Sequence, residues 1–216
     1  MLLFAFILFA FLQTSFPLPA TENPAPTHNP AVEFFKEIPL KPFKDLNEKH
    51  LKEDTGFQAA LVYLKSPEWI QMVADVRKDP AWLEYKKFLN DSAIDIEFVI
   101  KHVEHCLNAT NTKDFKVDKV KPSLGKFFDD VKTTYSVLVL KAAQNYLAKE
   151  SNSATYRNFI AKLQSQESRK MLEKALGQPP VKKVALKLKE MDFDIEFLLE
   201  FYYSLLGWRP IYKFSA

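Results

Sequence analysis

The tetrapeptide Asp95-Ile96-Glu97-Phe98 occurs a second time in this sequence of 216 residues, as Asp194-Ile195-Glu196-Phe197. The two copies lie 99 positions apart (194 − 95 = 99). Each copy opens a run of mostly apolar side chains and follows a charged segment with helical periodicity. If the offset extends beyond four residues, the chain contains an internal repeat, and the fold must be interpreted as two related units.

The offset extends well beyond the tetrapeptide. When residues 57–98 are laid over residues 156–197 without a gap, 10 of the 42 positions are identical, whereas roughly two to three identities are expected from composition alone. Upstream of these residues, equivalent positions of the two copies lie fewer than 99 residues apart, which places three extra residues near 151–153 in the second copy. The sequence therefore predicts a diverged tandem duplication, with one unit over 31–108 and the other over 109–208. Each unit is expected to hold five or six short helices, and the two together are expected to form one globular domain.

The composition favours helices and excludes several classes of site. Hydrophobic residues make up 47% of the chain, so a substantial core can form. Only four glycines are present, and phosphate-binding loops, dinucleotide fingerprints and nucleophile elbows need clustered glycines. The net charge of +3 is small and its lysines are interspersed with glutamates, which gives no indication of nucleic-acid binding. A single cysteine, Cys106, allows no intrachain disulfide.

The two ends of the chain differ from its body. Residues 1–20 contain an apolar run of 11 residues, which is too short to cross a bilayer and is typical of a secretory signal. We expect cleavage after Ala20; a cut nearer Ser15 and a retained membrane anchor are the alternatives. The proline-rich residues 21–30 are predicted to be an extended leader, and residues 209–216 a C-terminal tail.

Local signals mark several helix ends. Ser66-Pro67 and Asp79-Pro80 each combine a good N-cap residue with proline at the first helical position. In the alignment of the two units Asn108 falls on Gly207, and these are the residue types that most readily adopt the left-handed conformation after a helix. We therefore predict that the last helix of each unit ends at these positions.

The order of these motifs resembles the insect allergen-related repeat family, which includes the cockroach midgut allergen and the nitrile-specifier and microvillar proteins of insect guts. The resemblance covers about residues 31–208, and the second unit departs from it by lacking the Ile-Pro pair. The motifs that carry it are Phe34-Phe35, Ile38-Pro39, Tyr63-Leu64-Lys65-Ser66 and Ile94-Asp95-Ile96 in the first unit, and Phe127-Phe128, Lys162-Leu163-Gln164-Ser165 and Phe193-Asp194-Ile195 in the second.

The resemblance implies an all-α capsule in which the two units enclose an apolar cavity that holds fatty acids or other lipids. It also implies secretion into the lumen of an arthropod gut. From the residues alone, the apolar segment 197–208 predicts a helix that buries several faces, and it suits a solid bundle as well as a capsule. The cavity-lining candidates, for each of which ordinary core packing is the alternative, are Trp69, Ile70, Trp82, Phe88, Phe98, Phe159, Leu198, Phe201, Tyr202 and Leu205.

Two histidines and the single cysteine lie close together in the segment 102–106. His102 and His105 share a helix face and suggest a metal, but the duplication places them opposite Phe201 and Ser204, so no metal is expected. Cys106 falls on an apolar position and is interpreted as a small buried hydrophobe.

The acidic residues of the repeated tetrapeptide are interpreted as helix caps and first-turn residues rather than as catalytic carboxylates. Asn90 and Asn108 begin N-glycosylation sequons, whose occupancy the sequence leaves open.

The leading hypothesis is a secreted, non-enzymatic lipid-binding protein of the arthropod gut, linked to digestion or detoxification and needing no cofactor. One alternative is a nitrile-specifier-like modifier of plant toxin breakdown. Another is a structural or membrane-active gut-surface protein with weak contact to the membrane surface.

Overall fold

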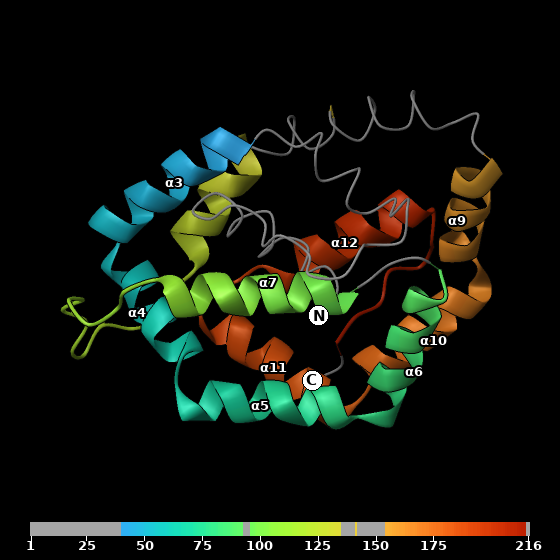
Figure 1. Ribbon diagram of the computed structural model, residues 1–216, viewed down its shortest axis with the longest axis horizontal. Helices are drawn as coiled ribbons and strands as arrows, with labels where there is room; N and C mark the ends of the chain where they lie inside the picture. The colour runs from blue at the N-terminus through green and yellow to red at the C-terminus, as the bar shows by residue number, and fades with distance from the viewer. Residues whose placement is uncertain (1–39, 93–95, 135–140, 142–153, 215–216) are drawn as a thin grey trace.

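The computed structural model describes residues 40–92, 96–134, 141 and 154–214, and every regular element in these ranges is an α-helix (Figure 1). The predicted all-α class is confirmed. The predicted signal, the leader and the Phe34-Phe35 and Ile38-Pro39 motifs lie outside the described residues. Within the described ranges, no helix is both long enough and apolar enough to cross a membrane.

The helices of the two halves begin at the spacing predicted from the sequence. The first half contains α3 (Leu40–Glu53), α4 (Thr55–Leu64), α5 (Pro67–Lys78), α6 (Pro80–Asn90) and α7 (Ile96–Ala109). The second half contains a helical segment at 125–134, then α9 (Ala154–Gln164), α10 (Gln166–Leu176), α11 (Pro179–Glu190) and α12 (Ile195–Leu206). The starts of α4 and α9, α5 and α10, α6 and α11, and α7 and α12 each differ by 99 (154 − 55, 166 − 67, 179 − 80, 195 − 96).

The predicted N-caps are present as hydrogen bonds. Ser66 Oγ accepts from the backbone N–H of Trp69 at 3.2 Å, and Asp79 Oδ1 accepts from Ala81 and Trp82 at 2.9 and 3.1 Å. In the second half, Ser165 Oγ caps α10 in the same way. Because a cap depends only on residues within one turn, local sequence is sufficient to place these helix starts.

The two predicted C-terminal ends differ. Gly207 has φ of +70° and ends α12 with a tight turn, in which the N–H of Trp208 donates to the carbonyl of Tyr203 at 2.8 Å. The prediction for Asn108 is wrong, because this residue lies inside the last turn of α7, which continues to Ala109. The physical difference is the direction of the chain: α7 is followed by a long connection over 110–124, whereas α12 must reverse at once to bury Trp208.

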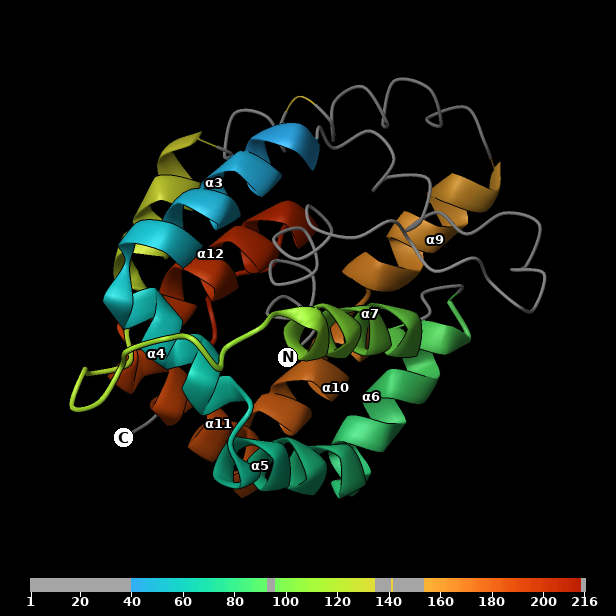
Figure 2. The same ribbon diagram turned by 60° about the vertical axis from the view of Figure 1, so that its left-hand side comes forward.

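Two pairs of helices pack across the boundary between the halves, and we call each pair a crossing. Helix α6 packs on α10 and helix α5 packs on α11, and both pairs lie side by side in the two views (Figures 1 and 2). Adding 99 to the residue numbers at which α5 and α6 start gives the starts of α10 and α11. The pair α5–α11 is therefore equivalent to the pair α10–α6. Both halves contribute side chains to a single buried hydrophobic cluster, in which the equivalent Leu89 and Leu188 are 0% and 1% exposed.

Candidate functional site

Helix α12 carries two apolar faces of different character. One face is buried in the common core and includes Leu198, Leu199 and Tyr203. On another face Phe197 and Phe201, one turn apart, remain 36% and 39% exposed. Two adjacent exposed phenylalanine rings form a contiguous apolar surface, which makes this face a candidate for contact with an apolar ligand or partner.

Neighbouring elements hold the first turn of α12. Asp194 Oδ1 accepts from the backbone N–H of Phe197 at 3.0 Å, and Lys132 donates to the other carboxylate oxygen at 3.3 Å. The Lys132 ammonium also lies 5.4 Å from the centre of the Phe197 ring, against which Phe128 packs edge-on at 6.0 Å. Phe197 is therefore anchored to the segment 125–134, and Phe201 is the more open of the two rings.

A pair of phenol hydroxyls joins α12 to α6. The oxygens of Tyr85 on α6 and Tyr202 on α12 are 3.1 Å apart. Burial is the largest cause that raises both pKa values, well above the usual range for Tyr85 and to about 12 for Tyr202. Both hydroxyls are consequently neutral at physiological pH, and each can donate a hydrogen bond.

The next tyrosine has a structural role. Tyr203 Oη donates to Glu173 Oε1 at 3.0 Å, and Arg169 Nε donates to the same oxygen at 2.9 Å. Arg169 also donates to the carbonyls of Arg209 and Pro210 at 2.7 and 2.9 Å. This network fastens the segment after α12 to α10, and burial raises the pKa of Tyr203.

The structure separates the predicted cavity-lining residues into three groups. Trp69, Trp82, Phe88 and Leu198 are buried in the common core, and Tyr202 is partly buried beside it. Ile70 and Phe201 are exposed, Ile70 by 59% because Trp69, Met72 and Val76 take the core-facing side of α5. The side chains of Phe98, Phe159 and Leu205 lie outside the described residues.

The other predicted sites lie at helix ends or outside the described residues. Asn90 is the last residue of α6, and both Asn90 and Asn108 are exposed. His105 is exposed, whereas the side chains of His102 and Cys106 lie outside the described residues. Among the side chains that the structure describes, no three histidine, cysteine or acidic groups converge as a metal site.

Sequence reasoning missed a buried histidine. His50, only 4% exposed, places Nδ1 at 3.0 Å from Asp54 Oδ2 and Nε2 at 3.1 Å from Asp130 Oδ2. Lys49 donates to the same Asp130 oxygen at 2.9 Å and is the largest cause that holds the pKa of Asp130 below its usual value. The four-residue spacing of His50 and Asp54 is visible in the sequence, but the contact with Asp130, which joins α3 to the second half, is not.

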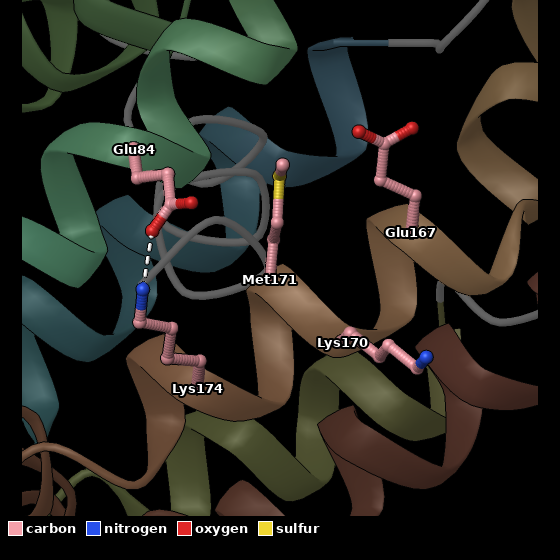
Figure 3. Close-up of a pocket in the computed structure, with 5 residues that line it drawn as sticks. All are labelled: Glu84, Glu167, Lys170, Met171 and Lys174. Atoms are coloured by element: carbon pink, nitrogen blue, oxygen red, sulfur yellow. Dashed lines mark hydrogen bonds and ion pairs between the residues drawn. The ribbon is translucent and has the colours of Figure 1, made fainter.

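A pocket of about 370 Å³ lies where α6 meets α10 (Figure 3). Its lining residues are Glu84, Glu167, Lys170, Met171 and Lys174. Lys174 donates to Glu84 at 2.6 Å, and Figure 3 shows Met171 between this pair and Glu167. Four charged side chains around one methionine suit a solvated surface depression better than a site for a long apolar chain.

The comparisons with known proteins agree with the resemblance described above. Neither the curated proteins nor the solved structures include a match to this chain. The model of one family, described as insect allergen related repeat, nitrile-specifier detoxification, matches residues 28–199. This match spans most of the chain and both halves of the helical core, so the protein belongs to the insect allergen related repeat family.

Proposed function

We propose that this protein is a non-enzymatic carrier of apolar small molecules, such as fatty acids or similar lipids, that is secreted into the arthropod gut. Membership of a family described by detoxification supports a role in handling small molecules from food. The apolar run in residues 1–20 supports export. The carrier binds its ligand and releases it without changing it.

The observation that carries this proposal is the open apolar face of α12. Phe201 is 39% exposed although its neighbour Leu198, on the adjoining face, is 2% exposed. An alkyl chain lying along this face removes both the ring and its own methylene groups from water, with a gain of about 0.8 kcal/mol for each buried CH₂. A ligand held in this way needs no charged partner along most of its length.

Purification from the native source followed by organic extraction and mass spectrometry tests the proposal directly. We expect long-chain lipids to copurify with the folded protein in a fixed molar ratio. A native preparation that contains no extractable apolar molecule would contradict the proposal.

A pair of variants tests the place of binding. Phe201→Glu puts a charge on the open face of α12, and Leu186→Glu makes a comparable change at an exposed residue of α11. We expect Phe201→Glu to weaken binding of a fluorescent fatty-acid probe by about tenfold or more, because the lost burial is worth roughly 1.5–3 kcal/mol. Leu186→Glu is expected to bind like the wild type. Equal weakening by both variants would move the site away from α12.

The printed family description favours one second candidate, a modifier of plant toxin breakdown. In this alternative the protein redirects the products of a glucosinolate and myrosinase reaction toward nitriles. Chromatography of the reaction products with and without the protein distinguishes the two functions. An unchanged product mixture would exclude the alternative and leave the carrier proposal standing.

A further inference from the structure

The two halves of this protein share an apolar interface. Helix α6 packs on α10 and helix α5 packs on α11, and the common buried cluster takes side chains from both halves. Within this cluster the ring centres of Phe57, in the first half, and Phe127, in the second, are 4.4 Å apart. A half without its counterpart would expose this surface to water, which is unfavourable.

The interface is close to two-fold in its pairing of helices. The first half contributes α5 and α6, and the second half contributes their equivalents α10 and α11. An interface in which equivalent elements exchange places is the kind by which identical protein copies pair. The surface of α5 and α6 that receives the second half of its own chain can therefore receive the second half of another copy.

The connection between the halves, residues 110–124, runs beside α4. At its start the Lys65 ammonium, at the C-terminal end of α4, donates to the Thr110 carbonyl at 2.5 Å. Near its end the Ser123 N–H donates to the carbonyl of Gly56, in the first turn of α4, at 3.0 Å. Both views show the connection looping outward next to this helix (Figures 1 and 2).

The connection is longer than this path requires. Between Gly56 and Lys65 the helix axis advances nine residues (65 − 56 = 9), or about 14 Å, and the reach of the Lys65 side chain widens the span to roughly 20 Å. The thirteen Cα steps from Thr110 to Ser123 (123 − 110 = 13) can cover about 45 Å. Slack of this size lets the halves meet within one chain at an effective concentration of the order of millimolar.

We infer that the interface between the halves can also form between two copies of this chain, and that the length of the connection 110–124 keeps the pairing within one copy. In the exchanged dimer each lobe consists of the first half of one chain and the second half of the other. Both crossings are rebuilt in each lobe, and Tyr85 of one chain contacts Tyr202 of the partner chain. At micromolar concentrations the unaltered protein stays monomeric, because the effective concentration of its own halves is higher.

Deletion of residues 111–120 tests the role of the connection. The remaining three Cα steps between Thr110 and Ser123 cover about 11 Å, which is less than the path along α4. We expect the shortened chain to fold as a dimer, with twice the mass of one chain in size-exclusion chromatography with light scattering. A folded monomer would overturn the inference.

The matched control replaces the same ten residues with a glycine-serine segment of equal length. This control loses the packing of Phe115 against the core just as the deletion does, but it keeps the slack. It is expected to be monomeric. A dimeric control would overturn the inference, because the length of the connection would then not decide the pairing.

Cleavage of the connection tests the interface without shortening the chain. A specific protease site is placed within residues 113–119 of the full-length protein, which is cleaved after folding. The halves are expected to elute together, and after unfolding in urea and dilution to recover the far-UV circular dichroism of the uncleaved protein. Separation of the halves, or loss of refolding in the cleaved protein alone, would show that the interface needs the covalent link and would overturn the inference.

The ion pair between Glu84 and Lys174 shows whether a dimer of the shortened chain exchanges its halves. Lys174 donates to Glu84 at 2.6 Å across the α6–α10 crossing. When shortened chains carrying Glu84→Lys and Lys174→Glu are refolded together, an exchanged heterodimer pairs opposite charges in both lobes, whereas each homodimer pairs like charges. Native mass spectrometry at low salt should find more heterodimer than random pairing gives, with the excess falling as salt screens the charges. Random pairing at low salt would mean that another surface holds the dimer, and it would overturn the inference.

Discussion

The two helix crossings of this protein pair helices at the same sequence spacing, but their interiors differ. At both crossings the helices start at positions related by 99 residues, and each contains a fully buried leucine, Leu89 in one half and Leu188 in the other. The α6–α10 crossing also holds the buried hydroxyls of Tyr85 and Ser168, whereas Trp69 and Val184 stand at the α5–α11 crossing. The two leucines have the same packing role, so the crossings differ in the polarity of the side chains around them.

The largest effects should come from the retained leucines. We expect Leu89→Ala and Leu188→Ala each to lower the free energy of unfolding by about 2–5 kcal/mol, because each leaves a cavity in a close-packed core. The two losses should be similar, and unfolding in urea followed by circular dichroism should remain a single transition, since both leucines belong to one buried cluster. Two separate transitions in either variant would show that the halves fold independently.

Changes at the N-termini of the equivalent helices α6 and α11 are expected to alter stability less, and in opposite directions. Asp79 caps α6 with two backbone hydrogen bonds, whereas Gln178, at the equivalent place before α11, makes no side-chain cap bond. We expect Asp79→Ala to destabilise the protein by about 1–2 kcal/mol and Gln178→Asp to stabilise it by about 1 kcal/mol.

Thermal unfolding at neutral pH measures both changes. The gain from Gln178→Asp is reduced by the loss of the Gln178 amide bond to the Lys174 carbonyl. If Gln178→Asp destabilised the protein, the Gln178 bond to Lys174 would contribute more to stability than an N-cap at this position. The starts of α6 and α11 would then be stabilised by different interactions.

Sequence alone predicted the features that depend on neighbouring residues. The helix class, the caps at Ser66 and Asp79, and the turn at Gly207 follow from interactions within one or two turns of the chain. The predicted duplication added the spacing of the helices in the second half. Asn108 shows the limit of this reasoning, because the path of the chain after a helix decides whether a residue with left-handed preference adopts that conformation.

The contacts at the candidate site could not be predicted in the same way. Tyr85 and Tyr202 are 117 residues apart, and His50 and Asp130 are 80 apart. Their meeting depends on which helices cross, and neither periodicity nor the repeat specifies that pairing. Periodicity likewise marked the apolar faces of α5 and α12 without distinguishing buried Trp69 and Leu198 from exposed Ile70 and Phe201.

The smallest effect concerns Asp130, which joins the two halves at α3 and depends on pH. Its pKa is lowered in the folded protein, chiefly by the hydrogen bond from Lys49. A lowered pKa in the folded state contributes stability above the unfolded value near 3.9, and this stability is lost as the pH falls through the folded value. We expect Asp130→Asn to reduce stability at neutral pH by roughly 0.5–1 kcal/mol, since the side chain is 41% exposed and solvent screens its ion pair.

Urea unfolding at several pH values tests this sign. The curves of the wild type and Asp130→Asn should differ at neutral pH and converge below about pH 4, where the wild-type carboxylate becomes protonated. Asp129→Asn is the control, because Asp129 is more exposed and contacts Lys132 within its own segment rather than α3. Parallel curves that never converge would mean that Asp130 acts through packing around His50 rather than through its charge. In that case the contribution of Asp130 to the free energy of unfolding would not depend on pH, like that of the buried leucines.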